Sequence, residues 1–236
     1  MAALPDQLLG RVQQHPDHIA LRGPAAELSY QDLWRAAGAV AEQLRNLGVK
    51  RIGLCGVNTP AWVVADLACL MAEVVCVPVP VFFSKSQTEH LIQRAGLDAL
   101  LFSAEAEQAE AIGQGVWLRH LPVSPGAAWM PEHTAKITFT SGSTGTPKGV
   151  CLSAQQMAAT ACALQQRLEG VTLQQHLCIL PLATLLENIA GVYLPLLMGA
   201  TVTVAPLQTL GMTGSSGLEL GQLVAGLNQH QPHSVI

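Results

Sequence analysis

The sequence predicts an α/β fold, a three-layer α/β/α arrangement around a mostly parallel, open sheet. Segments with strand character alternate along the chain with segments of helical periodicity, and this alternation indicates parallel strands joined by right-handed crossovers. Several predicted strands are apolar without interruption, of which residues 74–79 are the clearest example. Continuous apolar character is typical of strands that are covered on both faces.

Helical periodicity and end signals define the elements of the first half. Apolar residues recur at helical spacing from Gln31 onward, and Gly48 supplies the stop. Pro60 is a typical first helical residue, and Ser86 with Glu89 has the spacing of a capping box. The predicted helices span residues 4–14, 31–47, 60–73, 86–95 and 104–112, and the predicted extended segments span residues 28–30, 51–55, 74–79, 97–102 and 116–118.

The second half begins after a proline-containing loop at residues 121–132. Strands are predicted at 136–140, 176–180 and 200–204, and helices at 153–168, 185–198 and 217–228, the first of them capped by Ser153. Another strand begins near Ser234 and leaves backbone groups unpaired at residue 236. We therefore expect a fragment, made of a first αβ segment over residues 1–133 and a second segment over residues 134–236.

The composition excludes several classes of protein. Half of the 236 residues are hydrophobic, 12% are charged and the formal net charge is −4, which is typical of a core-rich globular chain. The lysines and arginines are scattered, whereas nucleic-acid binding needs a clustered basic face, so no nucleic-acid partner is expected. The six cysteines form no Cys-x-x-Cys pair. They indicate reduced thiols in a cytoplasmic protein, and the N-terminus lacks the features of a signal peptide.

The apolar stretch at residues 189–207 is long enough to suggest a transmembrane segment. Pro195, Gly199 and Pro206 interrupt it, and residues 201–204 alternate as in a strand. A buried helix followed by a buried strand explains the pattern better. No transmembrane segment is therefore expected.

The turn at residues 141–149 is the strongest functional feature of the sequence. Its glycines allow close approach of the backbone to an anion, successive backbone N–H groups in such a turn can form an anion-binding concavity, and Lys148 adds a charge suited to phosphate. Small hydroxyl side chains complete a cradle for a triphosphate. The residues concerned are Thr140, Ser141, Gly142, Ser143, Thr144, Gly145, Thr146, Pro147, Lys148 and Gly149.

Other nucleotide and catalytic motifs do not fit this turn. A Walker A loop needs four residues between its glycines and Ser or Thr directly after its lysine, whereas Gly142 and Gly145 are three apart and Gly149 follows Lys148. The dinucleotide motif Gly-x-Gly-x-x-Gly and the hydrolase motif Gly-x-Ser-x-Gly are both absent from the turn. A P-loop NTPase is therefore disfavoured.

The string from Thr140 to Val150 resembles the phosphate-loop signature of the AMP-binding, acyl-adenylating enzymes, which include acyl-CoA synthetases, adenylation domains and luciferases. Residues 28–33 are similar to an early motif of that family. Residues 180–187, Leu-Pro-Leu-Ala-Thr-Leu-Leu-Glu, are similar to its Leu-Pro-Leu-x-His block, in the form found in long-chain fatty-acid–CoA ligases. Thr184 stands where that block has His.

The resemblance implies a reaction and a set of roles. A carboxylate, expected to be a fatty acid, attacks the α-phosphorus of ATP, and the acyl group of the resulting acyl-AMP then passes to CoA. The loop residues from Thr140 to Thr146, with Lys148, bind the ATP phosphates. Lys148 and Thr144 are the candidate catalytic residues, Ser143 is the candidate Mg²⁺ ligand, and Thr184 and Glu187 are candidates for the acyl pocket. Peripheral contact with a membrane is compatible with such a substrate.

The resemblance covers the N-terminal portion of the large AMP-binding domain. Its adenine-binding and Tyr-Gly-x-Thr-Glu motifs and its C-terminal domain are expected beyond Ile236, so the chain alone is expected to be inactive. Two alternatives stay open: an acyl-AMP ligase that delivers to a carrier protein, and a non-catalytic nucleotide-binding protein. The histidine pairs His15/His18 and His230/His233 lack a further ligand type nearby and are interpreted as solvated side chains rather than metal sites.

Overall fold

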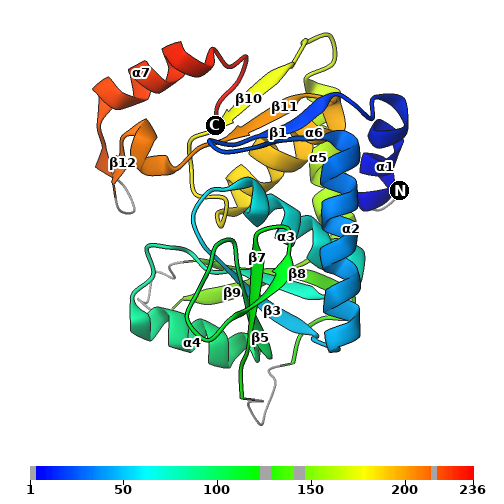
Figure 1. Cartoon of the computed structure of the whole chain (residues 1–236), viewed down its shortest axis with the longest axis vertical. Coiled ribbons are helices and arrows are strands. Elements are labelled where there is room, and N and C mark those ends of the chain that lie inside the picture. Colours follow the sequence, from blue (N-terminus) through cyan, green and yellow to red (C-terminus); the bar gives the residue numbers. More distant parts are fainter. Residues whose placement is uncertain (1–3, 123–128, 141–146, 214–216) are drawn as a thin grey trace. The chain divides into compact units, whose positions relative to one another are not determined.

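A computed structural model describes residues 4–122, 129–140, 147–213 and 217–236 (Figure 1). The chain divides into two compact units, each built from separate stretches of sequence. One unit comprises Met1–Arg35, Val57–Pro60 and Met157–Ile236, and the other comprises Ala36–Gly56 and Ala61–Gln156. Helices α2 (Tyr30–Leu47) and α5 (Ala154–Arg167) each contribute residues to both units.

The unit that contains residues 61–156 is built on a seven-stranded sheet. Its central strands are parallel and its outer strands are antiparallel. In spatial order the strands are β6 (Glu110–Gly113), β7 (Val116–His120), β5 (Ala99–Phe102), β3 (Arg51–Cys55), β4 (Val75–Pro78), β8 (Thr134–Thr140) and β9 (Lys148–Ser153).

Two helices connect the parallel strands of this sheet. Helix α3 (Pro60–Ala72) joins β3 to β4, and nine of its residues are buried. Helix α4 (Lys85–Ala95) joins β4 to β5 and places Leu91 and Ala95 in a core with residues of β4, β5 and β8. The apolar character of these strands therefore matches their burial beneath the covering helices.

The other unit is built on a four-stranded sheet in the order β10 (Gln175–Cys178), β11 (Thr201–Val204), β1 (Ile19–Arg22) and β2 (Glu27–Ser29). The first three of these strands are parallel, and β2 pairs antiparallel with β1. Around the sheet lie α1 (Leu4–Gln14), the π-helix η1 (Glu187–Tyr193), α6 (Leu194–Met198), the 3₁₀ turn η2 (Leu207–Leu210) and α7 (Leu220–His230); β12 (Met212–Thr213) and β13 (Gly217–Leu218) form a short ladder.

Long-range contacts tie the N-terminal elements of this unit to α6. The Tyr30 hydroxyl lies 3.0 Å from the carbonyl oxygen of Leu196 and 2.8 Å from that of Ala200. Burial raises the pKa of this hydroxyl well above its ordinary value, so Tyr30 stays a neutral hydrogen-bonding group. Arg11 Nε donates to the carbonyl oxygen of Leu197 at 2.6 Å.

The α/β class and most predicted elements are confirmed, but the helix predicted at residues 104–112 is wrong. Residues 110–113 form β6, which pairs antiparallel with β7. Gln108 and Gln114 adopt positive φ angles of 57° each, a backbone conformation incompatible with a continuous helix. Residues 110–113 thus form the edge strand of the sheet, although local periodicity favoured a helix.

Smaller differences concern element ends and types. Ser84, rather than Ser86, caps α4, in a capping box with Gln87. The predicted helix at 185–198 exists, but its first part is the π-helix η1. The final helix begins at Leu220, because residues 217 and 218 pair with β12. Strands β1 and β9 were not predicted.

Two exclusions made from the sequence are consistent with the structure. No helix within the described ranges combines the length and the apolar character that crossing a bilayer requires, and residues 189–207 divide into helix and strand as predicted. All six cysteines are free thiols.

Candidate functional site

The predicted phosphate loop connects β8 to β9, which form an antiparallel hairpin (Figure 1). Thr140, the last residue of β8, pairs with Lys148, the first residue of β9, and both are exposed. These two predicted loop residues therefore face each other across the base of the loop, and Pro147 and Gly149 are described as well. The remaining ones lie outside the described residues: Ser141, Gly142, Ser143, Thr144, Gly145 and Thr146.

The hairpin opens at the carboxyl edge of the parallel strands. β8 runs parallel to β4, and β4 runs parallel to β3, so Thr140 lies at the end of the sheet to which β3 and β4 also point. Open α/β sheets bind ligands in crevices beyond the carboxyl ends of their strands. The loop therefore leaves the sheet at the edge where this architecture places binding sites.

Helix α4 contacts the end of the loop that leads into β9. His90 Nε2 lies 3.2 Å from the carbonyl oxygen of Pro147, and Pro147 is buried. A cavity of about 460 Å³ adjoins this contact. Cationic groups of Arg51, Arg94 and Lys148 line it together with an apolar floor. Arg51 begins β3 and Arg94 lies in the last turn of α4, both at the amino edge of the parallel strands, so of these three residues Lys148 is the one at the loop.

Gly149 sets the close approach between the two strands of the hairpin. A β-carbon at this position would lie 2.8 Å from Cγ2 of Ile137 and 3.1 Å from Cε2 of Phe139. Ile137 and Phe139 are themselves core residues, so neither can move away without disturbing the packing beneath the loop.

We expect Gly149→Ala to lower the free energy of unfolding by about 1–3 kcal/mol, the usual cost of forcing an added methyl group against packed side chains. Urea denaturation of the 236-residue chain measures this change. Gly38→Ala is the matched control, because Gly38 lies in α2 with no atom within 4 Å of its would-be β-carbon. That variant should gain about 0.5–1 kcal/mol from helix propensity; equal responses of the two variants would contradict the packing argument.

A buried ion pair supports β8 beneath the loop. Lys136 Nζ lies 2.7 Å from Oδ1 of Asp66 on α3, and both side chains are 0% exposed. Cys76 on β4 also donates to Asp66 Oδ1, at 3.6 Å, and a hydrogen bond with Cys69 together with burial raises the pKa of Cys76 well above its ordinary value. The strand that leads into the phosphate loop is thereby fixed to the helix and strand next to it.

The predicted acyl-pocket residues lie on the segment before η1. Asn58 holds this segment, because its side chain donates to the carbonyl oxygen of Leu180 at 2.8 Å and accepts from the backbone N–H of Leu182 at 2.9 Å. Thr184 Oγ1 donates to the carbonyl oxygen of Pro181 at 2.8 Å. Glu187 is fully buried, and its carboxylate contacts residues of its own unit.

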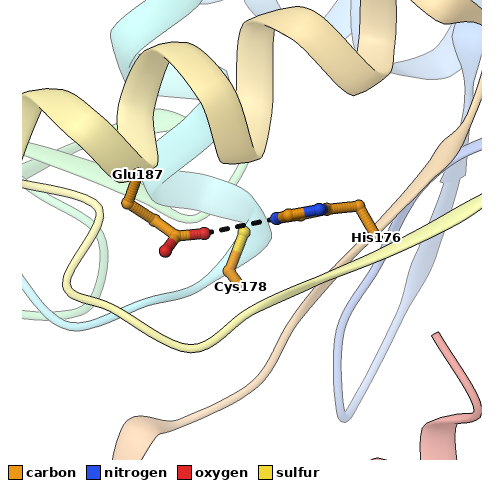
Figure 2. Close-up of side chains that lie close together, drawn as sticks. All are labelled: His176, Cys178 and Glu187. Atoms are coloured by element: carbon orange, nitrogen blue, oxygen red, sulfur yellow. Dashed lines mark hydrogen bonds and ion pairs between the residues drawn. The ribbon is translucent and has the colours of Figure 1, made fainter. Parts of the chain in front are cut away.

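The surroundings of Glu187 contain a cluster that the sequence analysis missed. His176 and Cys178 of β10 lie beside its carboxylate, and all three side chains are buried (Figure 2). Burial and the neighbouring Glu187 carboxylate raise the pKa of the Cys178 thiol well above its ordinary value. His176 and Cys178 are two residues apart in a strand and so share a face. This strand spacing could have indicated the cluster, whereas the histidine pairs His15/His18 and His230/His233 are spaced as on a helix.

Comparison with known proteins identifies relatives of this chain. The sequence pattern described as AMP-binding enzyme matches residues 9–215. Phosphinothricin tripeptide synthetase PhsC of Streptomyces viridochromogenes is 32% identical over 174 residues, which cover 63% of this chain and 16% of PhsC. The chain thus spans about a sixth of that relative.

Solved structures share the fold. O-succinylbenzoate coenzyme A synthetase of Bacillus subtilis, in complex with ATP and magnesium, superposes with a TM-score of 0.71 at 21% identity, covering 97% of this chain and 62% of that one. Fatty acid AMP ligase of Legionella pneumophila superposes with a TM-score of 0.78 at 17% identity, covering 99% and 43%. At these identities the likeness establishes the fold.

Proposed function

The chain belongs to the AMP-binding enzyme family, and from this premise we propose that it contributes the phosphate-binding loop of a ligase that activates a carboxylic acid with ATP. One observation carries the proposal: Thr140 and Lys148 face each other at the carboxyl edge of the sheet, on either side of a loop rich in glycine and hydroxyl groups. A loop that begins and ends in this way can surround a polyphosphate with backbone N–H groups.

Each loop residue has a proposed role. The backbone and hydroxyl groups from Thr140 to Thr146 would hold the β- and γ-phosphates, with Thr144 and Lys148 as the proposed catalytic residues. The exposed side chain of Lys148, at the end of the loop, fits a polyanion. Mg²⁺ would be held mainly by the phosphates, with Ser143 as the candidate protein ligand, and would neutralise phosphate charge.

The proposed chemistry transfers an adenylyl group. A carboxylate oxygen forms a bond to the α-phosphorus of ATP while the bond to the bridging oxygen breaks, and pyrophosphate leaves. Negative charge grows on the departing pyrophosphate, where preorganised N–H donors and Lys148 stabilise it. The acyl group then passes from AMP to a thiol, for which CoA is the leading candidate.

We propose a fatty acid as the substrate, because residues 180–187 resemble the long-chain form of the family's block. Thr184 and Glu187 are then the candidates for the acyl pocket. Because Glu187 is buried, it would act indirectly, by supporting the segment at Leu180 to which Asn58 also bonds. The similarity to a peptide synthetase favours a second candidate, an amino acid that is passed to a carrier-protein thiol. The six free cysteines support a reducing, cytoplasmic location.

Pyrophosphate–ATP exchange by the parent protein tests the proposal. A panel of fatty acids, amino acids and aromatic carboxylic acids, each with ATP and Mg²⁺, should reveal one class that supports exchange, and fatty acids are expected. The 236-residue chain alone should release no pyrophosphate. Addition of CoA or of a phosphopantetheinylated carrier protein then identifies the acceptor. ATP binding without exchange for any acid would establish the non-catalytic alternative instead.

A further inference from the structure

Three potential metal-binding atoms converge in the core of the unit that contains η1. His176 and Cys178 lie on one face of β10, and Glu187 is the first residue of η1. The His176 nitrogen, the Cys178 sulfur and a Glu187 oxygen all lie within 4.8 Å of one another, and all three side chains are buried (Figure 2). Imidazole, thiolate and carboxylate are the three ligand types that Zn²⁺ takes from proteins.

The spacing of these atoms is that of a long hydrogen bond and also that of two ligands of one cation. His176 Nε2 lies 3.4 Å from Glu187 Oε1, whereas N–H···O hydrogen bonds cluster near 2.9–3.0 Å. Zinc bonds of about 2.0–2.2 Å to nitrogen and oxygen in a tetrahedral site place two ligand atoms roughly 3.3–3.6 Å apart. The imidazole and the carboxylate already have this separation, and the Cys178 sulfur lies within 4.8 Å of both ligand atoms.

Two of the three residues, His176 and Glu187, are also oriented by a second contact. Ser234 Oγ lies 2.7 Å from His176 Nδ1, which leaves Nε2 for the cluster. The backbone N–H of Leu180 donates to Glu187 Oε2 at 3.1 Å, which leaves Oε1. Hydrogen bonds to the outer atoms of ligating histidines and carboxylates are the usual way in which proteins fix the orientation of metal ligands.

We propose that His176, Cys178 and Glu187 form a binding site for a transition-metal ion with the preferences of Zn²⁺. With three protein ligands, the fourth tetrahedral position is open to a water molecule or another small ligand. On binding, the Cys178 S–H proton passes to solvent, a sulfur–metal bond forms, and the hydrogen bond from Cys178 to the carbonyl oxygen of Gly191, at 3.6 Å, is lost.

The backbone around the cluster is closely fitted to it. A β-carbon on Gly191 would lie 2.1 Å from Glu187 Oε1 and 3.0 Å from His176 Nε2, so a larger residue cannot occupy this position without displacing two ligands. Glu187 also begins the π-helix, a conformation that is frequent at functional sites. Because the three donors are buried, the ion is expected to bind as the unit folds, and its role is to fix β10 to η1.

Cobalt binding tests the site directly. The reduced, chelator-treated 236-residue chain is refolded with stoichiometric Co²⁺, and its absorption spectrum is recorded. Ligation by Cys178 gives a thiolate-to-cobalt charge-transfer band in the near ultraviolet, which the solvated histidine pairs cannot produce. Cys178→Ser should abolish the band. Cys162→Ser is the matched control, because Cys162 lies in the same unit and bonds to Gln7 instead, and it should retain the band.

Two variants that keep the thiol address the other ligands. Glu187→Gln keeps an oxygen for the Leu180 N–H but removes the charge, and it should weaken Co²⁺ binding at least about tenfold. Ser234→Ala removes the contact with Nδ1 and should weaken binding by about 10–100-fold, as outer contacts of metal ligands do. A wild-type chain without the charge-transfer band, or a band that Cys178→Ser leaves unchanged, would overturn the proposal and identify a metal-free buried hydrogen-bonded cluster.

Discussion

Replacing Lys148 with alanine in the parent protein is expected to lower the rate of adenylation by about 10²–10³-fold, the loss that follows removal of one preorganised donor from a developing oxyanion. Lys148 is the first residue of β9 and pairs with Thr140, so its backbone is fixed at the end of the loop that would hold the phosphates. Alanine preserves the strand pairing, because the backbone bonds do not depend on the side chain. Single-turnover formation of acyl-AMP measures the effect on the chemical step.

Lys50→Ala is the control for charge alone. Lys50 is exposed and precedes β3, so it lies at the amino edge of the parallel strands, opposite the edge where Thr140 ends. Its removal lowers the net charge equally and should leave the rate within about twofold, since interactions between exposed charges beyond about 10 Å are largely screened. An unchanged rate for Lys148→Ala, or an equal loss for both variants, would remove the loop from the proposed mechanism.

Breaking the buried ion pair beneath the loop is expected to have the largest effect on stability. Lys136→Met leaves the Asp66 carboxylate without the ammonium that lies 2.7 Å away in a fully buried environment. Removing one partner of such a pair lowers the free energy of unfolding by about 3–5 kcal/mol, because the remaining group stays desolvated without its counterion. Guanidinium denaturation measures the loss, with the fluorescence of Trp62, buried on α3, as a reporter close to the pair.

Two further variants separate the cost of an unpaired charge from the worth of the pair. Asp66→Leu combined with Lys136→Met removes both charges and should recover much of the stability, since buried pairs often contribute little net stability compared with apolar residues. Arg22→Ala breaks the exposed pair with Glu27 and should cost less than about 1 kcal/mol. A double variant as unstable as Lys136→Met would show that the packing of the side chains, not the unpaired charge, dominates.

The two predictions separate function from folding within one hairpin. Lys148 is exposed and Lys136 is buried, although both lysines belong to the hairpin β8–β9. The exposed lysine can meet a ligand, whereas the buried one is committed to Asp66. Substitution of Lys148 should therefore leave the free energy of unfolding unchanged. Substitution of Lys136 should lower it, so any loss of activity in that variant would include the effect of unfolding.

The buried position of Glu187 changes how its substitution is to be interpreted. The sequence places it at the end of a block that resembles an acyl-pocket motif, and the structure turns its carboxylate toward His176 and the backbone N–H of Leu180. An effect of Glu187→Gln on substrate choice would then act through the segment around Leu180 and Thr184. The cobalt titration and the exchange assay distinguish the two roles, since one reports on the cluster and the other on the acid.

The sequence by itself determined the features that depend on neighbouring residues. The glycine- and hydroxyl-rich string between Thr140 and Val150 identified the loop, because the need for close backbone approach fixes residue types at fixed spacing. Helical and strand periodicity located most elements, since a regular element buries one face at a constant interval. The break at Gly199 marks the end of a helix before the strand β11 within an apolar run, whereas Pro195 lies in the first turn of α6.

Only the tertiary structure decided which distant segments meet. The pairing of β1 with β11, the ion pair between Asp66 and Lys136, and the convergence of His176, Cys178 and Glu187 join residues that local periodicity treats separately. The physical reason is that periodicity reports how each residue divides between core and solvent, but not which partner it finds in the core. Residues 104–112 show the same limit, because pairing with β7 at the sheet edge outweighs a helical preference that a short segment holds only weakly.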